Sequence, residues 1–412
     1  MKKLLLGLIT CFALVLVPAL ALSGCGKKSG GENKTATKKH TVTFVSENSS
    51  SVSLVEDGQM VKSVTAAKKE NHKFDSWYTE KNGTELYNFN SPVTQSITLY
   101  ARYYDSNLTM ATESDHAYAK DCKEGATSAI IPEIYHGLAV TEIGRWTFSQ
   151  CSQITNINIP NTVEAIGEHA FFGCTSLTSL TLPEGLKTID EWAFRECGIV
   201  SIVIPNSVIS IGVNIFSICS NLEEVSLPNT LSEIPSALFT YCNKLESVTV
   251  PASVKKIGHF AFGGNGSNEI GINFLGTLND WCKIEFDQFA YKWLKINGEE
   301  VTTITAEDLA GIETIKPYTF VGEFHFTSIT IPENVEKIEY DAFNQSVGML
   351  EINTIIIDSK TLYASLADDF LILNSIDYCY VQKAIVDDVG DVFRDVTKKD
   401  GQDEFADYYC FS

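Results

Sequence analysis

The sequence predicts a mostly β protein in which rungs of about 23 residues stack into a solenoid with a parallel sheet and short helical turns. Two observations support this architecture. An isoleucine and a phenylalanine recur five residues apart in eight places, and a cysteine follows each of the first five pairs three residues later. Prolines recur with nearly the same period. Because a fixed period of about 20–29 residues is typical of solenoids, we expect each repeat to form one rung.

The repeated residues indicate which side chains fill the interior. Successive steps are 23 residues long, with a single step of 22. We expect the phenylalanine rings to plug each rung and the cysteines to close it as small buried apolar groups. The predicted ladders are Phe148, Phe171, Phe194, Phe216, Phe239 and Phe262, and Cys151, Cys174, Cys197, Cys219 and Cys242.

Residues 1–25 have the pattern of a lipoprotein signal peptide. Two lysines precede a long apolar run, and small residues lead to Cys25. Leu22–Cys25 resembles the bacterial lipoprotein box, which implies that Cys25 is lipidated and becomes the new N-terminus. An uncleaved membrane helix is the alternative, because Leu4–Leu22 is nearly long enough to span a bilayer. The basic segment 26–39, rich in Gly and Ser, is then expected to be a flexible tether.

Residues 40–105 are expected to form a small β domain. Apolar and polar residues alternate after His40, a period that is typical of half-buried strands. We expect Trp77 to lie in the core of this domain, since aromatic residues dominate small cores. The motifs that resemble the Listeria–Bacteroides repeat, a β-grasp-like module of bacterial surface proteins, are Thr41–Phe44, Phe74–Tyr78 and Leu99–Ala101.

The repeats divide the rest of the chain into a cap, a solenoid and a tail. Residues 106–133 should cap the solenoid, because a terminal rung has no neighbour to cover its apolar face. Residues 134–349 should hold the repeats, with an insertion at 263–300 where the period is interrupted. Residues 350–412 keep short β runs and then turn acidic, so they should continue and close the solenoid.

A single rung is expected to combine a strand, a proline stop and a tight helical turn. Leu180 and Leu182 alternate with polar residues, and Pro183 ends the strand because proline donates no hydrogen bond to a ladder. The helical turn is expected at Glu191–Phe194. This order of leucine-rich strand, Pro, Ile-Gly, Ala-Phe and Cys resembles the BspA-like leucine-rich repeat family over roughly residues 108–380. The resemblance implies a surface protein that binds host or matrix proteins.

The cysteines raise the question of disulfides and metal ions. Their spacing lacks the C-x-x-C pattern of zinc ligands. Neighbouring rungs would bring the ladder cysteines near disulfide range, but parallel side chains about 4.8 Å apart fit disulfide geometry poorly. We therefore expect buried free thiols, no bound metal and no cofactor.

Charge and motifs favour neither nucleic-acid binding nor catalysis. The formal net charge is −21, and seven lysines lie in the first 40 residues, so the remaining body is more acidic still. Phosphate binding needs a basic patch, which makes nucleic acid an unsuitable partner. No H-E-x-x-H, G-x-S-x-G or dinucleotide motif supplies a catalytic residue. A solvated acidic cap or, alternatively, a calcium site is expected from Asp387, Asp388, Asp391, Asp395, Asp400, Asp403 and Glu404.

One position of the repeat gathers aromatic side chains. It lies on the turn, two residues before the ladder phenylalanine, and should point partly away from the core. Stacked rungs would align these rings into a stripe that could bind a sugar or an extended peptide. The alternative, which we favour because aromatic residues are usually recruited for burial, is that the rings seal the surface between rungs. The stripe candidates are Trp146, His169, Trp192, Phe260 and Tyr318, and Asn214, Ala237 and Asp341 occupy the same position in other repeats.

These features together predict an exported protein, lipid-anchored to the cell membrane, that faces the cell surface. Its expected function is adhesin-like binding of an extracellular protein or glycan through the solenoid. A structural spacer or envelope-assembly protein without a specific ligand is the alternative, and a calcium-dependent enzyme is a third. An exposed aromatic patch would favour binding, whereas an evenly polar surface would favour the spacer.

Overall fold

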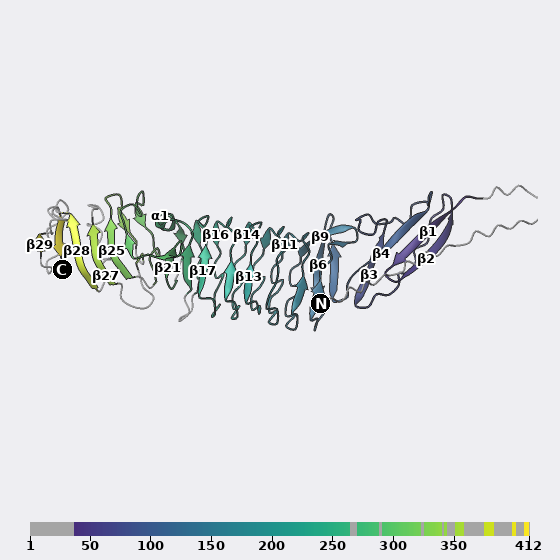
Figure 1. Ribbon diagram of the computed structural model, residues 1–412, viewed down its shortest axis with the longest axis horizontal. Coiled ribbons are helices and arrows are strands. Elements are labelled where there is room, and N and C mark those ends of the chain that lie inside the picture. The colour runs from purple at the N-terminus through teal and green to yellow at the C-terminus, as the bar shows by residue number, and fades with distance from the viewer. Residues whose placement is uncertain are drawn as a thin grey trace, which may run out of the picture.

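The computed structural model is an elongated rod, in which a four-stranded sheet at one end is followed by rungs stacked along the long axis (Figure 1). The expected signal segment and most of the acidic tail lie outside the residues that the structure describes. The described residues are 37–263, 270–287, 291–322, 325–339, 342–343, 351–357, 375–382, 398–400 and 408–411.

The N-terminal sheet has the strand order β2-β1-β4-β3. Its central strands β1 and β4 are parallel, whereas β2 and β3 pair antiparallel at the two edges. Trp77 is buried against Phe44, with ring centroids 5.0 Å apart, and its indole N–H donates to the Val64 carbonyl. The expectation that Trp77 is a core residue is therefore confirmed. The strands are β1 Lys39–Ser46, β2 Ser49–Glu56, β3 His72–Tyr78 and β4 Ile97–Asp105.

Buried hydrogen bonds join this sheet to the start of the solenoid. The Tyr78 hydroxyl donates to Asp75 Oδ2 over 2.6 Å and accepts from the Gly137 N–H over 3.0 Å. Asp75 Oδ1 accepts from the His136 N–H. Burial raises the pKa of Tyr78 far above its usual range, so the hydroxyl stays a donor. Because Tyr78 and Asp75 are both buried, the two parts are held by satisfied polar groups rather than by a loose linker.

The cap begins the first face of the solenoid. β6 runs parallel to β9, and β5 pairs antiparallel with β6 and ends the sheet. The cap therefore covers the apolar edge of the first rung, as a terminal repeat requires. The cap strands are β5 Leu108–Thr112, β6 Ala117–Cys122, β7 Ser128–Ile130, β8 Ile134–Tyr135 and β9 Leu138–Ile143.

Two parallel ladders run along the rungs. One contains the short strands that carry the repeated isoleucine, and Ile143, Ile166 and Ile189 lie in register within it. Its further strands are β11 Ala165–Ile166, β12 Thr188–Ile189, β14 Ser210–Ile211, β16 Glu233–Ile234, β18 Lys256–Ile257, β20 Glu285–Phe286, β24 Thr314–Ile315 and β26 Lys337–Ile338.

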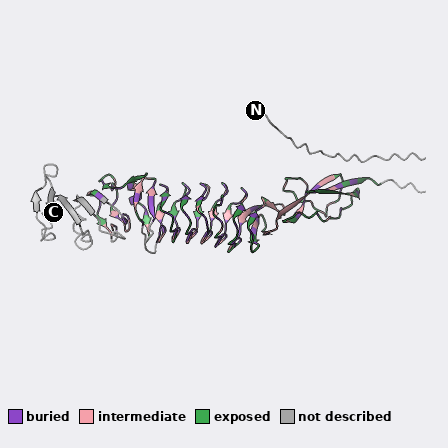
Figure 2. Ribbon diagram, turned by 60° about the horizontal axis from the view of Figure 1, so that its bottom comes forward, coloured by how far each residue is buried: buried purple, intermediate pink, exposed green. Residues whose placement is uncertain are grey.

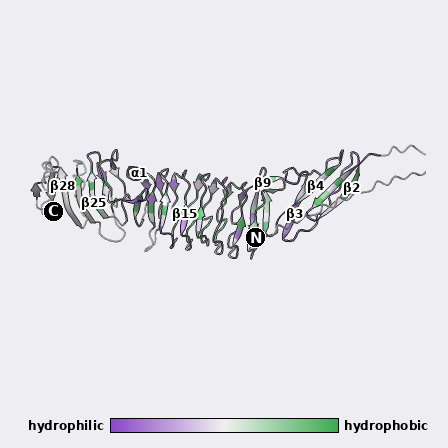
Figure 3. Cartoon of the chain, in the orientation of Figure 1, coloured by the Kyte–Doolittle hydropathy of each residue, from purple (hydrophilic) through white to green (hydrophobic). Residues whose placement is uncertain are grey.

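The second ladder contains the strands that end at the repeated proline. Buried and exposed residues alternate along it (Figure 2), and hydrophobic and hydrophilic residues alternate with them (Figure 3). The strands are β10 Asn156–Asn158, β13 Ser201–Val203, β15 Glu224–Ser226, β17 Ser247–Val250, β19 Gly271–Phe274, β21 Leu294–Ile296, β22 Glu299–Glu300, β23 Thr303–Ile304, β25 His325–Ile331, β27 Glu351–Ile357, β28 Ser375–Gln382, β29 Lys398–Asp400 and β30 Tyr408–Phe411.

The side chains expected to face outward from this second ladder are exposed. They are Asn158, Thr181, Val203, Ser226 and Thr249. The insertion contributes α1 (Leu278–Cys282), the only helix in the part of the chain that the structure describes. Thr277 caps α1 with a reciprocal bond to Asp280, and Trp281 is fully buried beneath it.

The phenylalanine ladder forms the centre of the core. All six rings are fully buried, and neighbouring ring centroids from Phe148 to Phe262 lie 5.3, 5.0, 5.7, 5.9 and 5.8 Å apart. The rings therefore stack at the spacing of the rungs, which is close to the separation of hydrogen-bonded strands.

The turn before each ladder phenylalanine is not helical, which corrects the expectation for Glu191–Phe194. Trp192 and Glu196 both have left-handed φ values, of +55° and +57°, so a right-handed helix cannot continue through them. Alternate residues bond across rungs instead: the Trp192 N–H donates to the Val213 carbonyl and the Phe194 N–H to the Ile215 carbonyl. The turns thus form a third hydrogen-bonded face of the solenoid.

Candidate binding surface

Three of the predicted stripe residues form one stack on the turn face. The indole of Trp146 and the imidazole of His169 have centroids 3.8 Å apart and planes 9° apart. His169 and Trp192 have centroids 4.9 Å apart and planes 25° apart. Trp146 is 44% exposed, and the other two rings are half-buried. The rings therefore cover one another and leave their outer edges in contact with solvent.

The backbone places these rings by adopting a conformation that bulky residues rarely accept. Trp146, His169 and Trp192 have φ values of +63°, +57° and +55°. Such a conformation costs about 1–2 kcal/mol for a residue with a Cβ, so Gly or Asn is the usual occupant. The same position in the fourth rung holds Asn214, with φ of +59°. Rings at three consecutive rungs must therefore offset this cost through their contacts.

Phe172 completes the cluster, and the sequence analysis did not identify it. Its ring meets those of Trp146 and His169 edge to face, with centroids 6.2 and 5.5 Å apart. The Arg195 guanidinium lies 5.9 Å from the Phe172 centroid. An aromatic residue three positions after a stripe residue, where the first repeat has Ser149, was the available signal.

Charged groups surround the stack without neutralising it. The Arg145 guanidinium pairs with Glu168 over 2.9 Å, and its side chain is 62% exposed. His169 Nδ1 lies 3.1 Å from Glu168 Oε1, but the angles do not form a hydrogen bond and this nitrogen is buried. Burial lowers the pKa of His169, and nearby Glu168 only partly opposes this effect. The imidazole between the two indoles is therefore neutral at physiological pH.

The other two stripe candidates do not join the stack. Phe260 is half-buried and lies against His259, with centroids 3.8 Å apart. Asn214 and Ala237 separate it from Trp192 along the stripe. Tyr318 is half-buried beyond the insertion, and Asp341 lies outside the described residues. The aromatic surface is thus confined to the first three rungs.

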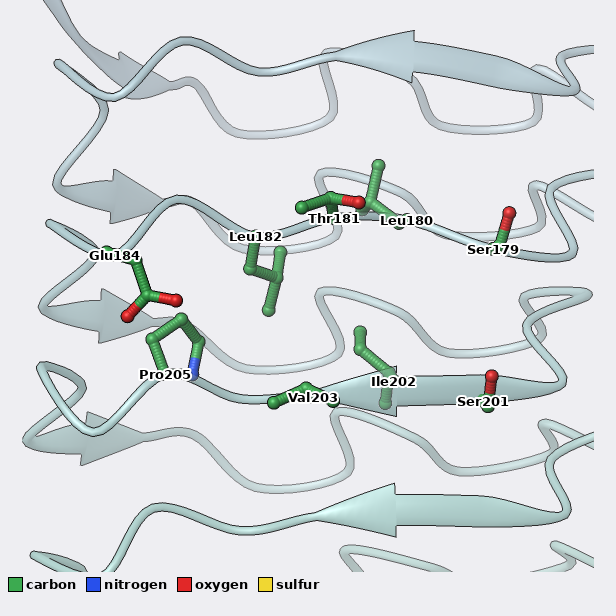
Figure 4. A pocket seen from close by; sticks show the side chains of 9 residues that line it. All are labelled: Ser179, Leu180, Thr181, Leu182, Glu184, Ser201, Ile202, Val203 and Pro205. Atoms are coloured by element: carbon green, nitrogen blue, oxygen red, sulfur yellow. The ribbon is translucent and has the colours of Figure 1, made fainter.

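A shallow hollow lies on the second ladder between two rungs. It has a volume of about 310 Å³, with Leu182 and Ile202 projecting into the space between the rungs and hydroxyl groups at the rim (Figure 4). Leu180 and Thr181 belong to a rung that forms no strand, and only an isolated bridge joins it to β13. The lining residues are Ser179, Leu180, Thr181, Leu182, Glu184, Ser201, Ile202, Val203 and Pro205.

The single 22-residue step explains this interruption. Gly198 stands where the other rungs have two residues, and a Cβ on it would lie 2.1 Å from the Thr175 carbonyl oxygen. Only glycine allows the shortened rung to approach its neighbour so closely. The hollow offers a small apolar floor, and Glu184 is the one ionisable group that lines it.

The ladder cysteines are buried free thiols in the structure. Those of rungs two to five point at the backbone of a preceding rung: Cys174 Sγ donates to the Phe148 carbonyl, Cys219 Sγ to Phe194 and Cys242 Sγ to Phe216. Burial raises the pKa of Cys197 and of Cys242 to about 12. Within the described ranges, no group of three or more His, Cys, Asp and Glu side chains is placed to hold a metal ion.

Stacked rungs with an interior phenylalanine ladder define a β-solenoid repeat protein, and comparison with known families identifies its class. The BspA type leucine rich repeat region matches in six copies over residues 141–268 and 296–377, which is more than half of the chain. The chain belongs to this family. The Listeria-Bacteroides repeat domain matches residues 40–102, which form the N-terminal sheet.

Solved structures with similar folds come from several bacteria. The leucine rich repeat protein TpLRR of T. pallidum is 31% identical over 42% of this chain and 85% of its own, with a TM-score of 0.37. A leucine-rich repeat protein from Bacteroides ovatus is 23% identical over 71% of each chain, with a TM-score of 0.37. A leucine rich cell surface protein from Faecalibacterium prausnitzii is 18% identical over 67% of this chain and 94% of its own, with a TM-score of 0.34. No curated protein matches the chain.

Proposed function

We propose that this chain is an exported, lipid-anchored surface protein that binds an extracellular macromolecule through its solenoid, as an adhesin does. Membership of a bacterial leucine-rich repeat family supports a binding role. The lipoprotein-like segment ending at Cys25 supports export and anchoring. Among the described residues, no helix has the length and apolar character needed to cross a bilayer.

The observation that carries the proposal is the stack of Trp146, His169 and Trp192. Its rings are held at left-handed positions, and the outer ring keeps 44% of its surface exposed. Partly exposed tryptophans beside arginines have the composition of binding hot spots. Arg145 and Arg195, two of the four arginines in the chain, lie at this stack.

The geometry favours a protein segment over a glycan as the ligand. A sugar usually stacks on the open face of an aromatic ring, but here the facing surfaces of the three rings cover one another. The exposed ring edges and the exposed guanidinium of Arg145 suit apolar and carboxylate side chains of an extended peptide. We therefore assign the ligand to extracellular proteins with an acidic, apolar-containing segment.

Two other functions are less well supported. A spacer without a ligand fits the rod shape and the buried junction at Tyr78, but it does not account for exposed Trp146. A calcium-dependent enzyme rests on the tail acids, whose side chains lie outside the described residues.

A pull-down with the full chain tests the proposal. Immobilised protein is exposed to matrix proteins and, separately, to a glycan array. The variant Trp146→Asn/Trp192→Asn removes the ring edges but keeps a residue that Asn214 shows to be compatible with this backbone. We expect protein capture to fall at least about tenfold, the loss of one or two hot-spot residues, with the melting temperature nearly unchanged.

A matched control separates the stack from other surfaces. Val203→Ala removes an exposed apolar side chain, 66% accessible, from the rim of the hollow. We expect this variant to bind normally. Normal capture by a stable Trp146→Asn/Trp192→Asn variant would refute the role of the stack, and capture of glycans alone would refute the protein ligand.

A further inference from the structure

The first cysteine of the ladder has a neighbour that the 23-residue period does not reveal. β7 and β10 pair in register with an offset of 28 residues, so that Ser128 lies beside Asn156. The same offset carried back along the rung places Cys151 beside residue 123, next to Cys122 at the end of β6. Cys122 therefore meets the ladder at its N-terminal end, in the cap.

The contact between these two thiols differs from every other contact in the ladder. The thiols of Cys174, Cys219 and Cys242 donate to the carbonyl of a ladder phenylalanine two rungs apart in the cysteine series or one rung before. No ladder phenylalanine precedes Phe148, so Cys151 has no such carbonyl to bond. The Cys122 and Cys151 side chains share a hydrogen bond instead.

The pair is also the least enclosed among the seven described cysteines. Cys122 and Cys151 are 8% and 6% exposed, whereas the other four ladder cysteines and Cys282 are at most 3% exposed. A small reagent can therefore reach this pair more easily than the deeper thiols. Their positions in the cap and in the first rung, one residue out of register, also free the two side chains from the parallel alignment that disfavours disulfides between ladder cysteines.

We infer that Cys122 and Cys151 form an oxidation site, at which a low-molecular-weight disulfide such as oxidised glutathione converts the two thiols into a disulfide that fastens the cap to the first rung. The bond would close a loop from residue 122 to residue 151, which contains β7, β8 and β9. The cap protects the open end of the solenoid, so fastening it stabilises the rung that carries Trp146.

The reaction proceeds by two exchanges. The hydrogen bond from Cys122 lowers the pKa of Cys151, which makes Cys151 the attacking thiolate, and the same bond raises the pKa of Cys122. Cys151 Sγ attacks oxidised glutathione, forms a mixed disulfide and releases one glutathione thiolate. Cys122, losing its proton, then attacks Cys151 Sγ and displaces the second glutathione. The two thiol protons end on the two glutathione molecules, so atoms and electrons balance.

Peptide mapping of the full chain tests this site. Native protein in detergent is treated with oxidised glutathione at pH 8, the remaining thiols are alkylated, and the chain is cleaved at Lys, Arg and Glu. Cleavage after Glu164 and Glu168 separates Cys151 from Cys174, so a linked peptide identifies its partner. Counting thiols alone would not suffice, because Cys379 and Cys410 lie on the paired strands β28 and β30.

We expect a Cys122–Cys151 linked peptide, its disappearance after dithiothreitol, and a melting temperature higher by at least about 3 °C in the oxidised protein. Cys122→Ser should abolish the linked peptide and the shift, whereas Cys197→Ala should retain both. Recovery of Cys122 and Cys151 from oxidised wild-type protein as separate alkylated or glutathionylated peptides would overturn the inference, whatever the folding of the variants. A link from Cys151 to Cys174 would overturn it equally.

Discussion

The imidazole of His169 lies parallel to the indole of Trp146, with centroids 3.8 Å apart, and a second indole, that of Trp192, covers its opposite face. A titratable ring is thus enclosed between two aromatic faces near the surface of the rod. Because burial lowers the pKa of His169, the enclosed ring favours its neutral form. Protonation therefore links this surface to pH.

We predict that acidification destabilises the first rungs through His169. The unfolded chain protonates this side chain near its ordinary pKa of about 6.5, whereas the folded pKa is lower. The unfolded state consequently binds the proton first, and stability is lost as the pH falls through 6.5 towards the folded pKa.

His169→Phe tests this prediction, because it keeps a stacking ring and Phe260 shows that the position accepts phenylalanine. Melting temperatures are measured from pH 7.5 to pH 5 for both proteins, which share Glu168, Arg145 and Arg195 around the ring. The variant should lose less stability over this interval. Superimposable profiles would show that His169 does not contribute.

We predict that Phe194→Ala costs about 3–5 kcal/mol of unfolding free energy, because it opens a cavity in a fully buried stack. Phe194 lies between Phe171 and Phe216, at centroid distances of 5.0 and 5.7 Å. Chemical denaturation measures the loss. Val203→Ala, on the exposed strand face, should cost less than about 0.5 kcal/mol. Equal losses would contradict the assignment of the phenylalanine ladder as the core.

We predict that Gly198→Ala destabilises the protein by about 1–3 kcal/mol, because its Cβ would overlap the Thr175 carbonyl oxygen at 2.1 Å. Gly185→Ala is the matched control, since its Cβ would come no closer than 3.2 Å to the Asn161 carbonyl oxygen. Thermal unfolding compares the two. An unchanged melting temperature for Gly198→Ala would mean that the short rung can widen without loss.

We predict that Cys174, Cys197, Cys219 and Cys242 resist alkylation in the native protein at pH 8. Burial raises the pKa of each thiol, so the reactive thiolate is scarce as well as inaccessible. N-Ethylmaleimide labelling followed by peptide mapping, before and after denaturation, measures this. Rapid native labelling of these four would be evidence against a closed interior.

We predict that Cys25→Ala releases the protein from the membrane fraction. Leu22–Cys25 is similar to the lipoprotein box, and two acyl chains with a basic tether are sufficient for stable anchoring. Fractionation of cells expressing either protein measures the change. Equal retention of the variant would indicate that an uncleaved apolar segment holds the chain instead.

The sequence by itself determined the repeating part of the fold. In a stacked solenoid each interior residue contacts its own counterpart in the next rung, so a period in the sequence becomes a contact in space. The positions of Ile143, Phe148 and Cys151 within a rung, and the limits of the N-terminal sheet, could be predicted for this reason.

Only the tertiary structure decided the features that depart from this period. The left-handed turn that stacks Trp146 on His169 depends on hydrogen bonds between rungs, and no local propensity favours it for such bulky residues. The proximity of Cys122 to Cys151 follows from a 28-residue offset in the cap. The junction of Tyr78 with Gly137 joins two domains whose separate sequence patterns carry no information about each other. Contacts between unlike elements have no counterpart to repeat, so periodicity cannot reveal them.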